Sequence, residues 1–368
     1  MVLNLLSLLL FLWFPYVGNE PADATMLFVG DAMQHTPQIN SAKQSDGSYD
    51  YTPCFRFLRS QIEAADYSVA NLECPLGGKP YSGYPRFSAP DEFAVALKEV
   101  GFDLLQTANN HTMDKNDSGA LRTITVLDSI GIPHVGTYKR SEEGDFNDVP
   151  HVANVGAYKV AFLAYTYGTN GIPVQSNTLQ VNYINEEKMA ADINVAKRMG
   201  VDFICVMLHW GIEYMNRENA LQRNIAGFLL GEGVDIIVGT HPHVVQPMEM
   251  RFNLATGRNS LIIYSLGNFI SNQNDTNSRG GALARVSLGV MNRALVIKDA
   301  ECDLFFVQKP DKKEANYRLV PVASPELLGE ESRTQYSGFL KNARNIFEKH
   351  NVNVPFVPLA ADVASAVE

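Results

Sequence analysis

The stretch that decides the fold is Asp235-Ile-Ile-Val-Gly-Thr-His-Pro-His243, an apolar run that ends in two histidines. The apolar residues are typical of a strand in an α/β sheet, and the histidines follow at its carboxyl end. In an extended segment, residues two apart point to the same side, so His241 and His243 are expected to face one site. Imidazole is a common metal ligand. The stretch therefore predicts a strand that delivers two candidate metal ligands.

Four other apolar runs end in residues of the same chemical kind. They are 26–30 before Asp31, 67–70 before Asn71-Leu72-Glu73, 104–108 before Asn109-Asn110-His111, and 203–208 before His209. A single histidine after a strand is more often structural than a ligand, but five such placements are hard to attribute to chance. Ligands bind at the carboxyl ends of strands in open α/β sheets, so we expect these residues to share one site.

Strand-like and helix-like segments alternate from about residue 25 to 290. The predicted strands cover 26–29, 67–70, 104–107, 160–165, 203–208, 235–238 and 261–264, and the predicted helices cover 54–64, 91–100, 117–130, 186–199 and 217–230. Glycines follow three of the helices, where a left-handed cap is favoured. The alternation predicts an α/β sheet protein.

The pattern changes after residue 290, where strand-like runs at 294–298 and 304–307 precede a helix over 331–350. This segment is either an appended subdomain or a flank of the same sheet. We therefore divide the chain into a leader (1–24), a main domain (25–290) and a C-terminal flank of strands and helix (291–368).

The composition limits the classes of function. The 368 residues are 46% hydrophobic and 19% charged, which excludes a disordered chain. The net charge of −10 argues against nucleic-acid binding through bulk electrostatics, so an anionic substrate needs a metal or a local arginine cluster. Four cysteines do not form a disulfide framework, although a Cys54–Cys74 disulfide stays open for an exported protein.

The N-terminus has features of an export signal. Residues 3–14 form an apolar run that is too short to span a bilayer and suits the hydrophobic region of a signal peptide. Ala22-Asp23-Ala24 offers small residues for cleavage, so we expect an exported, periplasmic or extracytoplasmic protein that begins near Thr25. The alternatives are an uncleaved membrane anchor and a packed N-terminal helix, because no Lys or Arg precedes the run.

The candidate ligands indicate the class of metal. Carboxylate and imidazole groups suit zinc, manganese or iron and need no thiolate. Glu73 could bridge two ions, because a carboxylate has two oxygens. Two ions about 3.5–4 Å apart can hold a bridging hydroxide and clamp the oxygens of a displacement reaction. We therefore expect one or two divalent metal ions as the cofactor.

Six motifs, in chain order, resemble those of the CapA family of bacterial capsule or poly-γ-glutamate biosynthesis proteins. They are Gly30-Asp31, Asn71-Leu72-Glu73, Asn109-Asn110-His111, His209-Trp210-Gly211, Gly239-Thr240-His241-Pro242-His243 and Ser265-Leu266-Gly267-Asn268-Phe269. This family is a branch of the calcineurin-like metallophosphoesterase superfamily. The resemblance covers about residues 25 to 290. It implies a four-layer α/β/β/α sandwich, with two sheets packed face to face and helices outside.

The resemblance also implies a role for each motif residue. Asp31 and His243 stand where the first metal has ligands, and Glu73 stands where the superfamily has a bridging aspartate. His111 resembles the acid that protonates the leaving group. The second metal would be held by Asn110, His209 and His241.

The first motif departs from the superfamily pattern. Typical members have Asp-x-His, whereas this chain has Met33 two residues after Asp31, as CapA relatives tend to have. The change removes one ligand from the first metal site. His35 is a candidate replacement, and the competing interpretation is a solvated loop histidine.

Three further residues are candidates for substrate binding. Arg86 lies in a stretch that matches a family motif and could hold a substrate carboxylate, or it forms a surface ion pair. Arg279 belongs to a polar loop at 271–281 that either lines the mouth of the site or is simply solvated. Asn268 either supports the site or caps the strand turn. Glu213 either orients an imidazole or begins a helix, and His134, His151 and His350 are expected at the surface.

Three functions fit these observations. The first is a metal-dependent hydrolase or transferase that acts on a capsule-type anionic polymer or a phosphorylated precursor. The motifs support it because metal, activated water and acid each have candidates. The second is a non-catalytic binding protein for anionic polymer, which the histidine missing from the first motif favours. The third is a scaffold in membrane-associated polymer-synthesis machinery, which only the apolar N-terminus supports.

Overall fold

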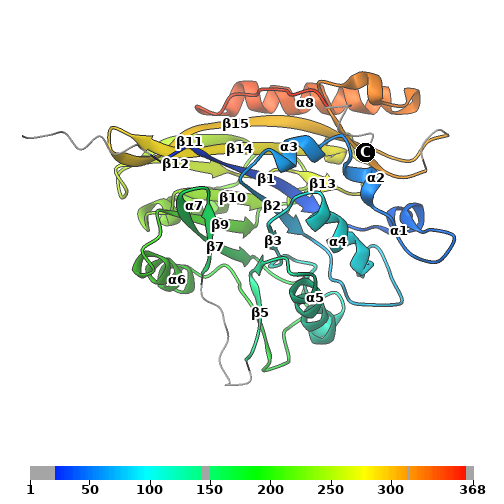
Figure 1. Ribbon diagram of the computed structural model, residues 1–368, viewed down its shortest axis with the longest axis horizontal. Helices are drawn as coiled ribbons and strands as arrows, with labels where there is room; N and C mark the ends of the chain where they lie inside the picture. The colour runs from blue at the N-terminus through cyan, green and yellow to red at the C-terminus, as the bar shows by residue number, and fades with distance from the viewer. Residues whose placement is uncertain (1–20, 142–149, 313–314, 362–368) are drawn as a thin grey trace, which may run out of the picture.

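The computed structural model describes residues 21–141, 150–312 and 315–361. Within these residues, two large sheets pack face to face and helices cover their outer faces (Figure 1). The four-layer α/β/β/α arrangement predicted from the sequence is thereby confirmed. A separate two-stranded ribbon joins β5 (Thr137–Lys139) to β8 (Leu179–Val181).

The first sheet combines parallel and antiparallel strands. In spatial order its strands are β16 (Arg318–Pro321), β15 (Ala294–Gln308), β14 (Gly280–Met291), β1 (Ala24–Ala32), β2 (Tyr67–Leu72), β3 (Leu104–Gln106) and β4 (His134–Val135), with β13 (Asn268–Ile270) also beside β1. β1 to β4 are parallel, so the polar residues that follow the first three of them emerge at the same edge.

The second sheet has a parallel centre and antiparallel edges. In spatial order its strands are β11 (Met248–Asn253), β12 (Arg258–Ile263), β10 (Ile236–Thr240), β9 (Phe203–His209), β7 (Tyr158–Thr166) and β6 (His151–Val155). The registers Thr166↔His209 and Thr240↔His209 place the carboxyl ends of β7, β9 and β10 side by side.

The alternation of side chains along each strand builds the layers. Met26 and Phe28 of β1 enter the core between the sheets, whereas Leu27 and Val29 face the outer helices. β9 divides in the same way, because alternate residues of a strand point to opposite faces. Both faces of these strands are buried, which explains their continuous apolar sequences.

Helices cover the two outer faces. The first sheet is covered by α2 (Thr52–Phe55), α3 (Arg59–Glu63), α4 (Asp91–Glu99) and part of α5 (Asn116–Ile130), and the second by α6 (Glu186–Arg198) and α7 (Ala220–Gly231). The helix predicted over 54–64 is thus two short helices. α7 begins later than predicted because Asn219 caps it through the backbone N–H of Gln222.

The C-terminal segment extends the first sheet. The two predicted runs at 294–298 and 304–307 belong to one strand, β15, which pairs along β14. α8 (Arg333–His350) lies beside β15 (Figure 1) and packs against its Phe306, so its apolar residues join the core between the two sheets. Of the two interpretations of this segment, its strands therefore support a flank of the same sheet.

Two expectations concern the export of the chain. The predicted signal peptide falls mainly on residues 1–20, outside the described residues. Among the described residues, every helix is too short or too polar to span a membrane.

The Cys54–Cys74 disulfide considered from the sequence is wrong, because all four cysteines are free and buried. The Cys54 thiol instead lies 3.5 Å from Asn316 Oδ1, and the Cys74 thiol lies 3.7 Å from the Ala32 carbonyl oxygen.

Candidate metal centre

The polar residues at the strand ends of both sheets converge on one buried cluster. Asp31 opposes Asn71 across β1 and β2, and His209 opposes Thr240 across β9 and β10. The backbone beside Asp31 is held close to a neighbouring loop, because Asp31 N donates to the Gly267 carbonyl at 3.0 Å. A side chain at Gly30 would collide with that carbonyl, since its Cβ would lie 1.8 Å from the oxygen.

One group of candidate ligands consists of Asp31, Glu73 and His243, all buried. His243 Nδ1 lies 3.0 Å from Asp31 Oδ2, and His243 Nε2 lies 3.8 Å from Glu73 Oε1. One ligand atom from each residue lies within 4.8 Å of the others, which is close enough for a single ion to contact all three.

A second group shares Glu73 and adds His209 and His241. His209 Nε2 lies 3.5 Å from Glu73 Oε1 and 3.0 Å from Asn110 Oδ1. The rings of His209 and His241 have centroids 4.8 Å apart. Glu73 thus lies between the two groups, at the position that a bridging carboxylate would occupy.

The segment that carries His241 and His243 is not extended, contrary to the prediction from the sequence. His241 has φ +98° and His243 has φ +58°, and residues 241–244 form a bend. The Pro242 carbonyl oxygen accepts from Tyr214 N at 2.8 Å, which fixes this turn. Both imidazoles reach the cluster because of left-handed backbone at both histidines, a conformation that non-glycine residues adopt only under local constraint.

Neutral polar side chains hold these groups in place. Asn71 Nδ2 donates to Asp31 Oδ1 at 2.8 Å and lies 3.4 Å from Glu73 Oε2. Asn109 in turn donates to the Leu72 carbonyl at 2.8 Å. His209 Nδ1 lies 2.9 Å from Thr240 Oγ1, so its Nε2 is the atom directed at Glu73. Such outer partners orient metal-binding side chains.

His111 is held by an acid that was not predicted from the sequence. Asp114 Oδ2 lies 2.8 Å from His111 Nδ1 and also accepts from Phe87 N at 2.7 Å. The Phe87 ring packs edge-on against the His111 ring at 4.6 Å. This leaves His111 Nε2 as the atom available for proton transfer. The spacing His-x-x-Asp within one turn was the signal that could have revealed Asp114.

The buried charges perturb one another. Burial raises the pKa of Glu73 well above its ordinary value, and the neighbouring Asp31 carboxylate adds to the rise. Burial alone would also raise the pKa of Asp31, but hydrogen bonding and charge from His243 outweigh it and lower that pKa. Burial lowers the pKa of His241 to about 3, and it lowers the pKa of His209 well below its usual value. Both imidazoles are therefore neutral near pH 7, the state that binds a metal.

Two orphaned atoms show that the donor set fits a metal ion. Among the residues that the structure describes, Glu73 Oε1 and His241 Nδ1 are buried and have no hydrogen-bond partner. Buried polar groups without partners are rare and ask for an explanation such as an ion. Carboxylate and imidazole donors within 4.8 Å of one another fit zinc, manganese or iron.

The three predicted substrate-binding residues lie in different surroundings. Arg86 is exposed, and its guanidinium donates to the Asp114 carbonyl oxygen (2.7 Å) and to Asn116 Oδ1 (3.0 Å) on the loop that carries His111. Arg279 is buried and donates to Val307 O and Gln335, so it holds the C-terminal flank instead of lining a solvated loop. The Asn268 amide nitrogen is also occupied: it donates to Gln273 Oε1 and to Ser278 O.

The alternatives for His35 and Glu213 are also decided by position. His35 is half-buried at the start of α1 (Thr36–Ala42), with Nδ1 3.1 Å from Gln38 Oε1, so it is neither a solvated loop residue nor a member of either buried ligand group. Glu213 does not begin a helix, since it lies in a turn before α7. Its exposed carboxylate forms a third possible ligand group with His241 and His243.

Tyr167 is a site residue that was not predicted from the sequence. It directly follows β7, and its backbone N–H donates to the His209 carbonyl at 3.0 Å. Its ring is stacked on His209, with an interplanar angle of 9°, and lies 4.6 Å from the His241 ring. The rule that found the other strand-end residues would have found Tyr167 too, had tyrosine been included among the residue types of interest.

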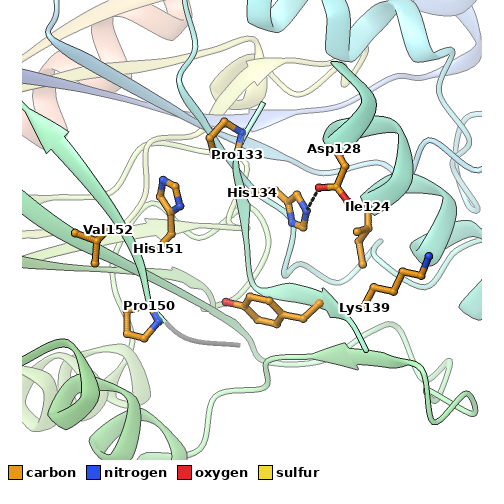
Figure 2. A pocket seen from close by; sticks show the side chains of 9 residues that line it. Ile124, Asp128, Pro133, His134, Lys139, Pro150, His151 and Val152 are labelled. Carbon is orange, nitrogen blue, oxygen red and sulfur yellow. Dashed lines mark ion pairs between the residues drawn. The ribbon is translucent and has the colours of Figure 1, made fainter. Parts of the chain in front are cut away.

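A hollow of about 400 Å³ lies apart from this cluster, between α5, β4, β5 and β6 (Figure 2). His134 and His151 line it, so both are partly buried rather than surface residues. His134 Nε2 pairs with Asp128 at 3.4 Å, and His151 Nε2 lies 3.2 Å from the Tyr67 hydroxyl. None of the predicted site residues lines this hollow. His350 is likewise remote, at the end of α8 and 3.0 Å from Arg217.

Comparison with known protein families shows to which family the chain belongs. The family described as bacterial capsule synthesis protein PGA_cap matches residues 25–273. The chain belongs to this family. Residues 25–273 include all six candidate ligands and His111, so the cluster lies wholly within the matched region.

Two curated relatives share the family. The chain is 30% identical over 286 residues to the capsule biosynthesis protein CapA of Bacillus anthracis, covering 74% of this chain and 66% of that protein. It is 32% identical over 270 residues to the PGA biosynthesis protein CapA of Bacillus subtilis (strain 168), covering 71% and 67%. The chain thus spans about two thirds of the length of these capsule proteins.

A solved structure supports the fold alone. A putative 5′-nucleotidase from Staphylococcus aureus, in complex with alpha-ketoglutarate, aligns with a TM-score of 0.50 and 15% sequence identity. The alignment covers 87% of this chain and 58% of that one. This PGA_cap member is therefore similar in sequence to the CapA proteins of Bacillus, and its fold is similar to that of the 5′-nucleotidase structure.

Proposed function

We propose that this CapA-like protein is a metal-dependent hydrolase or transferase that acts outside the cytoplasm on a phosphorylated precursor or on anionic capsule polymer. The observation that carries the proposal is the pair of ligand groups that share Glu73, together with the orphaned atoms Glu73 Oε1 and His241 Nδ1. Satisfied polar clusters are common in cores, but this one is left incomplete by the protein.

The residues that would hold the metals divide into two sets. Asp31 and His243 would hold one ion, and Asn110, His209 and His241 the other, with Glu73 between them. When bound, divalent metal supplies a polarised substrate oxygen and an activated water at neutral pH. The net charge of −10 repels an anionic substrate. The positive charge of bound metal ions would attract such a substrate to the site against this field.

The chain itself supplies proton transfer. Asp114 holds His111 by Nδ1, and the Phe87 ring restricts its orientation. His111 Nε2 would then donate a proton to the leaving oxygen, the role of a general acid. Asn71 and Asn109 keep the carboxylates fixed, so the geometry does not have to reorganise when charge develops.

Turnover on paired leaving groups tests this proposal. Full-length chain loaded with Mn²⁺ or Zn²⁺ is assayed on p-nitrophenyl phosphate, on phenyl phosphate, and on γ-glutamyl amides. We expect His111→Ala to keep its metal and to lose about 10²–10⁴-fold in turnover of phenyl phosphate. The loss on p-nitrophenyl phosphate is smaller, because nitrophenolate leaves without a proton. His350→Ala, which removes an imidazole at the end of α8 that contacts Arg217, is the matched control and should turn over both substrates as the wild type does.

A second candidate function is supported by Met33. This buried residue stands where the superfamily pattern has a histidine, so the first ligand group has three members. A binding protein for anionic polymer, working with membrane-associated synthesis machinery, needs metal but no turnover. Metal-loaded wild type that cleaves neither phosphoesters nor γ-glutamyl amides, yet binds poly-γ-glutamate, favours this function over catalysis.

A further inference from the structure

Two exposed tyrosines stand against the histidines of the candidate metal centre. Tyr167 is 48% exposed, and its ring lies 4.6 Å from that of His241. Tyr214 is 50% exposed, and its ring lies 6.1 Å from that of His243. The His241 and His243 rings are themselves 6.0 Å apart, so the two phenols flank one pair of imidazoles.

Backbone hydrogen bonds anchor the two segments that carry these rings. Tyr167 N donates to the His209 carbonyl at 3.0 Å, and Tyr214 N donates to the Pro242 carbonyl at 2.8 Å. Tyr214 also adopts φ +63°, an unusual conformation for a bulky residue that is retained only where the surroundings impose it. Rings held rigidly and half in water offer faces that are ordered before a ligand arrives.

Apolar and acidic side chains lie on the loop that carries Tyr214. Ile212 and Met215, on the same loop as Tyr214, are 55% and 53% exposed. The exposed Glu213 lies within 4.8 Å of ligand atoms of His241 and His243. The Glu213 carboxylate repels any second anionic group of a substrate whose phosphoryl group is bound by metal. The apolar and aromatic surface instead favours an uncharged substituent next to that phosphoryl group.

We propose that Tyr167 and Tyr214 line a subsite for an uncharged ring, either glycosyl or aryl, that is attached to the phosphoryl group bound at the metal centre. Aromatic side chains bind such rings through their faces. This inference rests on the metal site proposed above and deepens it, because it selects ring-bearing phosphoryl compounds over simple alkyl ones. It assigns specificity to two residues outside the ligand groups.

Binding of three phosphonates tests the subsite without any turnover. Full-length chain loaded with Mn²⁺ is titrated calorimetrically with methyl-, cyclohexyl- and phenylphosphonate, which share the metal-binding group and are not hydrolysed. In the wild type we expect at least one ring compound to bind about 3–10-fold more tightly than methylphosphonate, the range of one aromatic contact. A gain for cyclohexyl alone indicates a saturated, sugar-like ring, and a gain for phenyl indicates an aryl ring.

Variants then assign the gain to the two tyrosines. Tyr214→Ala should reduce it while leaving metal content and methylphosphonate affinity unchanged. Tyr167→Ala should also reduce it, measured relative to the variant's own methylphosphonate affinity, and Tyr167→Phe should retain it. Phe252→Ala, which removes a similarly exposed ring on β11, is the matched control and should change nothing.

Three results overturn the proposal. The first is equal affinity for all three phosphonates in the wild type, and the second is an equal loss for methyl and ring compounds in the tyrosine variants. In both, methylphosphonate still binds, so the metal site survives and only the subsite fails. The third is that no phosphonate binds to metal-loaded protein, which removes the phosphoryl site and the subsite together. A ring-dependent gain in a protein without turnover supports the subsite and contradicts only the catalytic function.

Discussion

The strand-end cluster and the C-terminal flank both bury polar groups, but they satisfy them differently. At the strand ends, Glu73 Oε1 and His241 Nδ1 have no hydrogen-bond partner among the described residues. Arg279, which precedes β14 and contacts the flank, is equally buried, yet it donates twice to the Val307 carbonyl oxygen and once to Gln335 of α8. Its guanidinium also lies 5.0 Å from the centre of the Phe306 ring.

This difference separates a ligand site from a structural contact. A buried polar group without a partner costs about 1–3 kcal/mol of stability, so it persists where a function needs it. Arg279 carries no such cost, because its side-chain nitrogens donate to Val307 and Gln335. Burial alone therefore does not mark function here, whereas burial with unsatisfied atoms at the carboxyl ends of parallel strands does.

The largest expected effect is loss of metal from the strand-end cluster. His209→Ala and His241→Ala should each lose the ion of the second ligand group, lowering the bound Mn²⁺ or Zn²⁺ by about one ion per chain, because either change removes a donor from that group. Elemental analysis after gel filtration measures the bound metal. Arg279→Met is the control from the flank and should bind as the wild type does. Full metal content in both histidine variants would contradict the ligand assignment.

The flank should respond in stability instead of metal content. Arg279→Met leaves the Val307 carbonyl and Gln335 without their buried donor, so we expect a loss of about 2–4 kcal/mol in the free energy of unfolding. Urea denaturation of the metal-free chain measures this value. A free energy of unfolding equal to that of the wild type, or a loss of metal affinity, would contradict the purely structural role of Arg279.

Metal should stabilise the folded chain through the strand-end cluster. At a free metal concentration about 100 times the dissociation constant, linkage predicts a gain of about 2.7 kcal/mol. Thermal unfolding with and without Mn²⁺ shows the gain as a rise in Tm. We expect the same rise in Arg279→Met and a smaller one in His241→Ala, and an undiminished rise in His241→Ala would contradict its role as a ligand.

The smallest expected effect concerns pH and the metal-free state. The raised pKa of Glu73 means that the folded chain holds this proton more tightly than the unfolded chain does. Stability should therefore fall as pH rises from about 4.5 towards the raised pKa. The glutamine side chain of a Glu73→Gln variant cannot titrate. At the upper end of this pH range, the free energy of unfolding of the metal-free variant should therefore exceed that of the wild type by roughly 1–3 kcal/mol. Urea denaturation across this pH range measures the difference, and identical pH profiles would contradict it.

The sequence was enough to predict much of the cluster. Polar residues directly after apolar runs are a local signal, and parallel strands bring such ends together, so Asp31, Glu73, His209 and His241 could be grouped from the amino-acid pattern alone. The conformation at His241 could not be predicted, because it depends on the distant contact between Tyr214 N and Pro242 O. Alternation of side chains correctly predicted that His241 and His243 face one site. The backbone that brings them there is a bend, not the extended segment that the prediction assumed.

Long-range pairing accounts for what was missed. β14 was not predicted as a strand, because Arg285, Ser287 and several small residues interrupt its apolar pattern. It forms by antiparallel pairing with β1, far away in sequence, and with β15. Arg279, directly before this strand, was expected either at the mouth of the site or in a solvated loop. The direction of a long side chain is set by tertiary partners such as Gln335, which no local pattern contains.

Anomalous diffraction from crystals of the full chain soaked in Mn²⁺ shows whether the strand-end cluster holds metal. We expect a peak in contact with Glu73, His209 and His241, at ligand distances of about 2.0–2.3 Å. A second peak beside Asp31 and His243 would lie roughly 3.5–4 Å away. Soaked crystals with ordered side chains at the cluster and no peak there, or with peaks only at other sites, would contradict the metal site.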